Sequence, residues 1–323
     1  MIFRILITDD THPTLADRLR MAGFDVVVDP SHDYDSLLSV VNDFDAIVVR
    51  SKIAIDRNFL DHVHRLKCIG RVGAGMETID VAYAESLGIC CVNSPEGNRD
   101  AVGEHAMGLL LALFDRISHA DAEVRQGVWH REANRGREVK GCTVGIIGFG
   151  NMGASFAKRL SGFDCEIIAY DKYKKAGFAP DYVREVSLQS LQQSADVLSL
   201  HVSLTTETYH LVDADFLSKF AKPVALINTS RGAVVDTPAL AAALKSGSVS
   251  GAALDVIEYE NMAKDGLNID GLTPDFQYLL QSDRTVITPH VAGWTVESKN
   301  KLADVLADKI IQTFNQYRCA DCR

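Results

Sequence analysis

Three side chains in the second half of the chain are suited to anion binding and proton transfer: Arg231, Glu260 and His290. Each follows an apolar run that ends in a polar cluster, and the cluster that contains Glu260 begins at Asp255. An arginine can hold a carboxylate through two parallel hydrogen bonds and polarise a neighbouring carbonyl. A histidine can give or take a proton near neutral pH, and a glutamate beside it stabilises its protonated form. Next to a nicotinamide, this set is suited to hydride transfer at a carbon that carries a hydroxyl group.

A glycine-rich turn is the second candidate site, one for a dinucleotide. The apolar run 144–147 leads into Gly148-x-Gly150-x-x-Gly153, and the helix-compatible segment 154–160 follows. We expect Gly148 to allow the tight turn, Gly150 to let the backbone approach a pyrophosphate, and Gly153 to let helix and strand pack closely. The N-terminus of the helix then offers N–H groups and a partial positive charge to the phosphates.

An acid at the end of the next apolar run indicates which dinucleotide binds. The run 166–170 is followed by Asp171, whose carboxylate can accept hydrogen bonds from a ribose 2′-hydroxyl and repel a 2′-phosphate. Lys172, Lys174 and Lys175 come next and soften that repulsion. The pattern therefore predicts NAD as the cofactor, in preference to NADP.

Short apolar runs alternate with helix-compatible segments, which predicts parallel sheets covered on both faces. In the first third we expect strands at 4–8, 25–28, 46–49, 68–71 and 89–92, with helices at 14–22, 34–41, 56–62 and 79–87. After Asp171 we expect strands at 197–202, 224–228, 251–255 and 285–288. Ligands of such sheets bind beyond the carboxyl ends of the strands, where Arg231 and His290 fall. The predicted fold class is α/β, with two doubly wound parallel-sheet domains.

Four further segments connect or extend these elements. A helix is predicted over 100–119, leading from the first domain towards the glycine turn. The polar segment 127–137 carries Trp129 and suits either an arm onto a partner or a plain surface loop. The polar insertion 266–281 receives no assignment. A last helix, 296–317, is expected to pack back onto the first domain.

Composition excludes several classes of function. A chain of 323 residues with 47% apolar residues fits two soluble domains, and a net charge of −10 argues against a nucleic-acid or membrane surface. The N-terminus is too short and too charged for a signal peptide, and no apolar run approaches the roughly 20 residues of a membrane span. The odd count of seven cysteines fits a reduced, cytoplasmic protein. Cys319-x-x-Cys322 lacks two further zinc ligands, so we expect no metal.

The motifs together resemble the D-isomer-specific 2-hydroxyacid dehydrogenase family over nearly the whole chain. The stretch 228–240 matches the signature that holds the family's catalytic arginine, here Arg231. Asp255-Val-x-x-x-Glu260 matches the segment of the catalytic acid, and Thr288-Pro-His290 matches that of the catalytic histidine. The resemblance implies an NAD-dependent oxidoreductase that interconverts a small D-2-hydroxy acid and its 2-oxo acid.

The resemblance also implies residues that bind cofactor and substrate. For NAD they are Ala74, Gly148, Gly150, Asn151, Met152, Gly153, Asp171, Val202, Ser203, Thr208, Thr229, Ser230, Asp255 and Gly293. Asp255 is expected to contact the carboxamide, and Ser203 stands where the family commonly has proline. For the substrate they are Arg50, Ser51, Arg71, Gly73, Ala74, Gly75 and Asn98, with the glycine-loop amides taking the substrate carboxylate.

The domain organisation expected from the family is an insertion. A Rossmann cofactor domain, 97–290, interrupts a flavodoxin-like substrate-binding (catalytic) domain, 1–96 and 291–323, and the active site lies in the cleft. The family also implies a homodimer built largely on the cofactor domain, with the Trp129 arm crossing to the partner.

Within the family the chain most resembles the D-3-phosphoglycerate dehydrogenases, through Arg50-Ser51, Arg71 and the stretch 94–98. Arg50 and Arg71 would then bind the phosphate of 3-phosphoglycerate or 3-phosphohydroxypyruvate, in serine biosynthesis. The alternative is that each arginine pairs with a local acid such as Asp45 or Glu77. The sequence has no counterpart of the C-terminal regulatory domain that many such enzymes carry, so serine feedback by that route is not expected.

Two other functions remain open. One is a glyoxylate or hydroxypyruvate reductase, or another D-2-hydroxyacid dehydrogenase. The other, from a different class, is an NAD-sensing interaction protein similar to the corepressors of this family.

Overall fold

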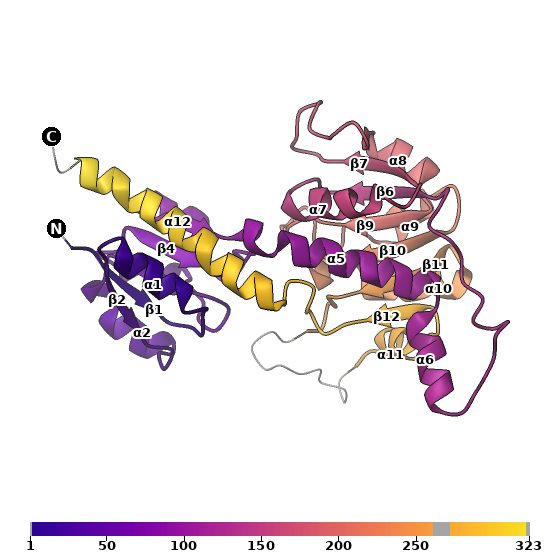
Figure 1. The fold of residues 1–323 in the computed structure, drawn as a ribbon, viewed down its shortest axis with the longest axis horizontal. Helices are drawn as coiled ribbons and strands as arrows, with labels where there is room; N and C mark the ends of the chain where they lie inside the picture. The colour runs from indigo at the N-terminus through magenta and orange to yellow at the C-terminus, as the bar shows by residue number, and fades with distance from the viewer. Residues whose placement is uncertain (1, 261–271, 321–323) are drawn as a thin grey trace. The chain divides into compact units, whose positions relative to one another are not determined.

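The computed structural model describes residues 2–260 and 272–320. Two compact units divide the chain: Met1–Asn98 together with Trp294–Arg323, and Arg99–Gly293. Each unit is built on a parallel sheet with helices on both faces (Figure 1), so the predicted α/β class with two doubly wound sheets is confirmed. No helix in the described part of the chain is long and apolar enough to cross a membrane.

The first unit alternates strands and helices and then takes up the last helix of the chain. Its elements are β1 (Arg4–Ile7), α1 (Thr14–Met21), β2 (Asp25–Val28), α2 (Tyr34–Val40), β3 (Ala46–Val49), α3 (Arg57–Asp61), β4 (Cys68–Arg71), α4 (Val81–Ser86), β5 (Cys90–Asn93) and α12 (Val296–Ala320). Over the described residues its sheet has five parallel strands in the order β2-β1-β3-β4-β5.

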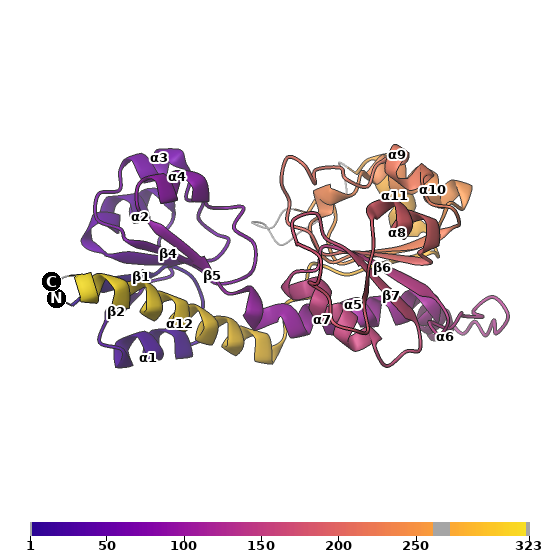
Figure 2. The same cartoon turned by 90° about the horizontal axis from the view of Figure 1, so that it is seen from above.

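Both faces of this sheet are buried, which is why its strands are continuous apolar runs. Helices α1 and α12 cover one face, and α2, α3 and α4 cover the other (Figure 2). Successive residues of β1 alternate between them: Ile5 and Ile7 lie in the core under α12, and Leu6 lies in the opposite core. The last helix therefore packs on the first unit, as predicted.

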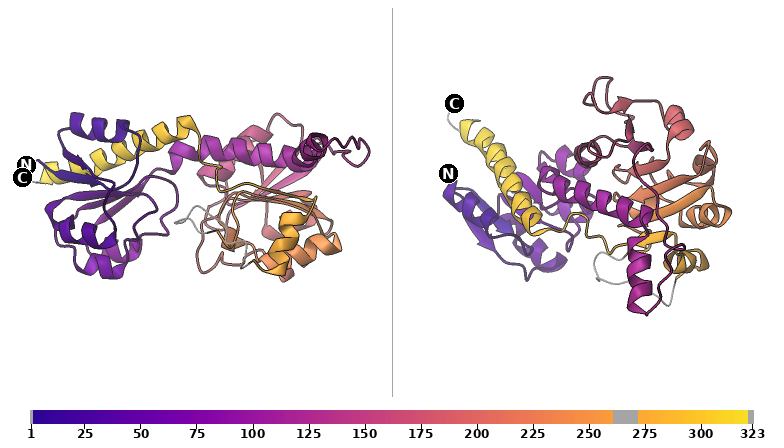
Figure 3. Two further views of the ribbon diagram at one scale, coloured as in Figure 1. Left: turned by 90° about the horizontal axis from the view of Figure 1, so that it is seen from below. Right: turned by 45° about the vertical axis from the view of Figure 1, so that its right-hand side comes forward.

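The second unit begins partway along a long helix, α5 (Pro95–Phe114). Its other elements are α6 (Ile117–Arg125), β6 (Thr143–Ile147), α7 (Asn151–Leu160), β7 (Glu166–Tyr170), β8 (Arg184–Glu185), α8 (Leu188–Ser194), β9 (Val197–Leu200), α9 (Ala214–Ser218), β10 (Val224–Asn228), α10 (Thr237–Ser246), β11 (Val249–Leu254), α11 (Pro274–Gln281) and β12 (Thr285–Ile287). The described residues form seven parallel strands in the order β12-β11-β10-β9-β6-β7-β8. Helices α5 and α7 cover one face and α8 to α11 the other (Figures 2 and 3).

The prediction of a single helix over 100–119 is wrong, because the structure has two helices there, α5 and α6. They separate at Arg116, which adopts a left-handed conformation with φ of 54°. The chain returns to this point later, and the Arg137 amide donates to the carbonyl of Phe114 while the Arg137 guanidinium lies over the Phe114 ring. A contact this distant in sequence ends α5, so the local apolar pattern did not reveal it.

The structure describes two segments that the sequence did not assign to a helix or strand, one of them only in part. The end of the polar insertion forms α11, which begins after the Thr273 cap and buries Phe276 and Leu279, whereas residues 266–271 lie outside the described residues. The segment after α6 contains no helix or strand up to β6, and its Trp129 is 76% exposed. Cys322 and the side chain of Cys319 also lie outside the described part.

The glycine turn joins β6 to α7. At two of its glycines, nearby backbone atoms leave no room for a side chain. A Cβ on Gly153 would lie 2.1 Å from the carbonyl oxygen of Gly148, and Gly148 itself has φ of 86° with its Cβ position 2.4 Å from the carbonyl oxygen of His201. At Gly150 no atom of the described residues, apart from the glycine and its two chain neighbours, comes within 4 Å of the Cβ position. The first and last glycines therefore serve the fold, and the middle one leaves open space beside the turn.

Candidate active site

The ends of three neighbouring strands carry the polar clusters of the second unit. Strands β10, β11 and β12 lie side by side (Figure 1). Their carboxyl ends lead into the segments of Arg231, Asp255 and His290. Because all the strands are parallel, these segments leave the sheet at the same edge. The expectation that the three clusters follow strand ends at one edge of the sheet is therefore confirmed, and the structure adds that the three strands are neighbours.

His290 and Glu260 form a direct pair. The Nδ1 atom of His290 lies 3.0 Å from Oε1 of Glu260, and the side chains are 28% and 21% exposed. His290 has φ of 53°, a conformation that costs free energy in a residue other than glycine. Its amide donates to the carbonyl of Asp255 (2.8 Å) and to that of Thr288 (3.0 Å). The surrounding turn thus holds the backbone of His290 in place while its imidazole faces Glu260.

The buried carboxylate of Asp255 holds this turn through hydrogen bonds. Its side chain is 1% exposed, and its carboxylate accepts from the Thr288 hydroxyl (2.6 Å), the Val291 amide (2.9 Å) and the Ala292 amide (2.8 Å). Burial by itself raises the pKa of Asp255, but hydrogen bonds from His105, Thr288 and the two amides outweigh it and leave the pKa lowered. An ionised carboxylate therefore holds the 288–292 turn, a role that the sequence did not suggest.

The Arg231 segment packs against the segment that leads to Glu260. A Cβ on Gly232 would lie 2.0 Å from the carbonyl carbon and oxygen of Ile257, so only glycine fits between the two backbones. Asn228 closes the turn by donating from Nδ2 to the carbonyl of Arg231 and accepting the Ser230 amide and hydroxyl at Oδ1. The Arg231 Nη1 atom donates to the carbonyl of Ser230 (2.6 Å).

Asp171 has a structural contact as well as the one expected with a ribose. Its Oδ2 accepts from the Phe149 amide (2.9 Å) and its Oδ1 from the Tyr173 amide (3.0 Å), so the carboxylate ties the glycine turn to the end of β7. Lys174 donates from Nζ to the carbonyl of Phe149 (2.6 Å), and Lys172 pairs with Glu207. Two of the three neighbouring lysines are thus engaged with the protein.

Several other predicted cofactor residues line the same edge of the second sheet. Asn151 and Met152 form the first turn of α7, and Val202, Ser203 and Thr208 belong to the loop after β9, which the Thr208 hydroxyl closes by donating to the carbonyl of Ser203 (2.6 Å). The Thr229 hydroxyl and His201 Nδ1 are buried without a hydrogen-bond partner among the described residues. Such atoms, together with the open space at Gly150, fit a bound dinucleotide.

In the first unit, Arg50 and Arg71 lie at the carboxyl ends of the neighbouring strands β3 and β4. The Arg50 guanidinium lies over the ring of Trp294, 4.5 Å from its centroid. The Arg71 Nη1 atom is 1.6 Å from the Cβ position of Gly73, so its guanidinium lies directly against this glycine, whose φ of 141° suits glycine. The carboxylate of Asp45, one of the local acids considered for these arginines, accepts from Arg65 (3.1 Å) and from the Arg4 amide (2.8 Å) before the start of β3.

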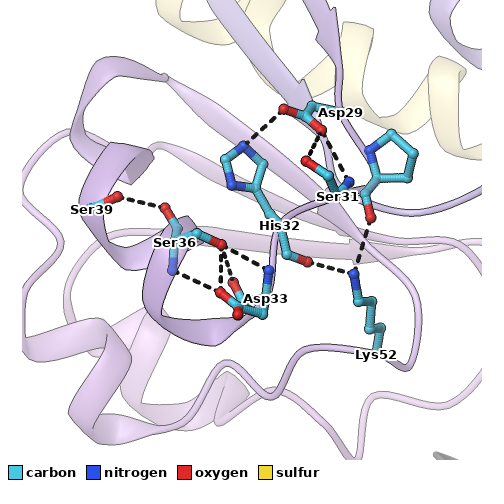
Figure 4. A network of polar contacts seen from close by, with 8 residues as sticks. Asp29, Ser31, His32, Asp33, Ser36, Ser39 and Lys52 are labelled. Carbon is cyan, nitrogen blue, oxygen red and sulfur yellow. Dashed lines mark hydrogen bonds and ion pairs between the residues drawn. The ribbon is translucent and has the colours of Figure 1, made fainter.

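Two contacts fix the loop that carries Arg50 and Ser51. Asp9, which the sequence analysis missed, accepts the Arg50 amide at 2.7 Å. Burial raises the pKa of Asp9, against the opposing effect of that amide and of Arg50, Lys52 and Arg71. Lys52 donates from Nζ to the carbonyls of Pro30 (3.0 Å) and His32 (2.7 Å), which joins this loop to the one before α2 (Figure 4).

The predicted glycine loop of the first unit is held by the residues at the end of β5. The Gly73 amide donates to the buried Ser94 hydroxyl (3.2 Å), and the Asn93 side chain donates to the carbonyl of Ala74 (2.6 Å). Gly75 is next in the loop, and Asn98 lies in the first turns of α5, its Oδ1 buried without a hydrogen-bond partner in the described part of the chain. Gly293 ends the second unit.

Known proteins resemble this chain over most of its length. The family model described as D-isomer specific 2-hydroxyacid dehydrogenase, NAD binding domain, matches residues 107–292. A glyoxylate reductase of Thermofilum pendens is 38% identical over 298 residues, 89% of this chain and 84% of that protein. A hydroxypyruvate reductase of Thermotoga maritima is 35% identical over 298 residues, 92% of this chain and 94% of that protein.

A D-3-phosphoglycerate dehydrogenase of Archaeoglobus fulgidus is 34% identical over 309 residues. The matched part is 95% of this chain but 56% of that protein, so the chain spans little more than half of that relative's length. The three relatives thus match this chain at similar identity and carry three different enzyme names.

Proposed function

Because the chain belongs to the D-isomer-specific 2-hydroxyacid dehydrogenase family, we propose that it catalyses NAD-dependent interconversion of a small D-2-hydroxy acid and its 2-oxo acid. The observation that carries the proposal is the 3.0 Å pair of His290 and Glu260 on segments that leave the sheet at the same edge as the Arg231 segment. NAD, when bound, supplies the hydride acceptor or donor.

His290 is the proton-transfer group in this proposal. Its Nδ1 atom is engaged by Glu260, so Nε2 takes the hydroxyl proton during oxidation and returns it during reduction. The Glu260 carboxylate keeps the imidazole oriented and stabilises the imidazolium that forms. The C2–H bond breaks as the hydride leaves, and the C2 oxygen becomes a carbonyl.

Arg231 is the anion-binding group in this proposal. Its guanidinium binds the substrate carboxylate and polarises the neighbouring carbonyl, which favours hydride attack at C2. The tight packing of Gly232 against Ile257 supports this role, because it fixes the Arg231 segment relative to the segment of Glu260. The positive charge also attracts an anionic substrate to a protein with a net charge of −10.

For the cofactor we propose that the second unit binds NAD through the glycine turn, the N-terminus of α7 and Asp171. The helix N-terminus and its free amides suit a pyrophosphate, and the acid suits a ribose 2′-hydroxyl. The buried Thr229 hydroxyl supports a further polar contact at the end of β10.

For the substrate we propose a phosphorylated acid, 3-phosphoglycerate or 3-phosphohydroxypyruvate, whose phosphate is bound by Arg50 and Arg71. Stacking on Trp294 leaves the N–H edges of the Arg50 guanidinium directed away from the ring face, which suits a phosphate. The engagement of Asp45 by Arg65 supports this reading over local pairing with that acid.

A specific observation also favours the second candidate, a glyoxylate or hydroxypyruvate reductase. Relatives with those names are 38% and 35% identical to this chain, against 34% for the D-3-phosphoglycerate dehydrogenase. The experiment that separates the two is a comparison of kcat/KM for phosphohydroxypyruvate, hydroxypyruvate and glyoxylate with NADH, in wild type and Arg50→Ala.

If Arg50 binds phosphate, Arg50→Ala should lose roughly 1.5–3 kcal/mol of transition-state binding, about one to two decades in kcat/KM. That loss should occur with phosphohydroxypyruvate alone. Equal losses on all three acids, or a wild-type preference for an unphosphorylated acid, would reject the phosphate and support the reductase.

We also propose a homodimer formed through the second unit and the segment of Trp129. The exposed apolar side chains of Ile117 and Val124 on α6, followed by Trp129, support a surface that another protein covers. Light scattering of Trp129→Ser should reveal a weakened dimer, and an unchanged dimer at nanomolar concentration would reject the arm.

A further inference from the structure

A histidine of α5 lies at the base of the turn that carries His290. The Nε2 atom of His105 is 3.0 Å from the hydroxyl of Thr288 and 3.4 Å from Oδ1 of Asp255. Helix α5 otherwise presents apolar side chains to the core on this face, among them Val102, Ala106 and Leu109. A polar side chain in that position requires a partner, and these two oxygens are its partners.

The direction of the hydrogen bonds follows from the groups involved. The Thr288 hydroxyl donates its one proton to Asp255 Oδ1, at 2.6 Å. It therefore accepts from His105, and Nε2 of His105 must carry a proton. The result is a relay in which His105 donates to Thr288, Thr288 donates to Asp255, and Asp255 accepts the amides of Val291 and Ala292.

This relay includes residues on both sides of His290 in the chain. Thr288 precedes His290 and Val291 follows it, while the His290 amide donates to the carbonyl of Asp255. The positive φ of His290 makes its backbone dependent on such contacts, because a relaxed turn favours a different conformation. Rotation of the Thr288 hydroxyl or of the Asp255 carboxylate would move the amides that flank His290.

We propose that His105 is a positioning residue for His290. It acts through Thr288 and Asp255 to hold the 288–292 turn, and it contacts neither substrate nor the reacting atoms. The proposal rests on the proposed function, in which His290 transfers the proton.

The first test measures turnover in three variants. His105→Leu keeps the bulk and removes the donor, so kcat should fall by roughly 10- to 100-fold, the usual consequence of a misplaced catalytic group. KM for the 2-oxo acid should change by less than about 3-fold, because Arg231 and its turn are untouched. His105→Gln, whose amide N–H reaches a similar position, should restore most of kcat. His62→Leu is the control, because His62 is exposed in the first unit and bonds to the carbonyl of Asn58.

Thr288→Val provides a second test of the proposal in case His105→Leu folds poorly. It removes the middle of the relay and should lower kcat by a similar factor. In the double variant of His105→Leu and Thr288→Val the losses should not multiply, because both break one chain of hydrogen bonds. A kcat for His105→Leu within 2-fold of wild type, equal impairment in His105→Gln, or multiplicative losses would each overturn the proposal.

The second test needs neither cofactor nor substrate and so separates this proposal from the proposed function. The rate at which diethylpyrocarbonate modifies His290 in the free protein is followed by mass spectrometry, with the other histidines as internal references. His105→Leu should change the His290 rate by at least about 3-fold, and His105→Gln should return it to that of wild type. If wild type turns over no 2-oxo acid, the proposed function fails, but this measurement still shows whether His105 positions His290. Identical His290 rates in all three proteins would reject it.

Discussion

Oε1 of Glu260 lies 3.0 Å from Nδ1 of His290, and the two side chains approach from segments that follow the neighbouring strands β11 and β12. The contact occupies one nitrogen of the imidazole. In the proposed reaction Nε2 exchanges the proton, and the carboxylate lies beside the imidazole on which positive charge develops during oxidation of a hydroxy acid.

Replacing Glu260 by glutamine keeps a hydrogen-bond acceptor near Nδ1 but removes the charge that stabilises the imidazolium. We expect kcat for oxidation of the hydroxy acid to fall by roughly 10-fold or more, because a charged hydrogen bond is lost from the transition state. Steady-state kinetics at one pH measures this. The exposed Glu132, which pairs with Arg135, offers the control Glu132→Gln, and equal rates in the two variants would remove Glu260 from the mechanism.

Two glycine substitutions should separate folding from cofactor binding. Gly232→Ala forces a Cβ to within 2.0 Å of the Ile257 carbonyl and should lower the free energy of unfolding by roughly 1–3 kcal/mol. Gly150→Ala meets no described atom within 4 Å, so stability should stay within about 0.5 kcal/mol while the Kd for NADH rises by roughly 10-fold. Denaturant melts and fluorescence titration measure the two quantities. A tight-binding Gly150→Ala variant would show that the pyrophosphate does not lie against this glycine.

Asp171→Asn should reduce the preference for NADH over NADPH. Asparagine keeps one oxygen, which can still accept from the Phe149 amide and tie the glycine turn to β7, but it loses the contact with the Tyr173 amide and the charge that repels a 2′-phosphate. We expect the ratio of kcat/KM for the two cofactors to fall by roughly 10-fold. Asp164→Asn, which changes an exposed acid paired with Lys140, is the control and should leave the ratio unchanged. A wild-type enzyme that uses both cofactors equally contradicts the assignment.

His201 should make the fold sensitive to acid. Burial lowers the pKa of His201 to about 3, far below the roughly 6.5 of an unfolded histidine. The unfolded chain therefore binds a proton that the folded chain does not, and stability falls as pH drops from about 6.5 towards 3. His201→Gln has no such proton, so its stability relative to wild type should improve as the pH falls through that window. Denaturant unfolding at pH 7.5, 5.5 and 4.5 measures the difference, and a gap that stays constant with pH counts against it.

The features that could be predicted from the sequence are those encoded in short, continuous stretches of it. The glycine turn, the strand ends before Arg231 and His290, and the acid after β7 are all written in short stretches, and the structure has them at those positions. The break at Arg116 was missed because it depends on Arg137 returning to Phe114. Asp9 and Trp294 were missed because each contacts Arg50 only after the chain has folded.

His105 is a case in which a signal existed and was overlooked. It interrupts the apolar face of a long helix, and a polar side chain there indicates a buried partner. The partners could not be predicted from the sequence, because Asp255 and Thr288 follow two different strands of the sheet, β11 and β12. Likewise, the contact of Asp171 with the Phe149 amide follows from the return of the glycine turn to β7, which no spacing in the sequence encodes.

The most direct test of the account is the rate of NADH oxidation by wild type and His290→Ala, with a panel of 2-oxo acids that includes phosphohydroxypyruvate, hydroxypyruvate and glyoxylate. We expect wild type to reduce at least one of them and His290→Ala to lose roughly 10²–10⁴-fold in kcat on that acid, the usual share of a general acid–base group. No turnover of any 2-oxo acid by wild type, or a near wild-type rate in His290→Ala, would contradict the proposed reaction.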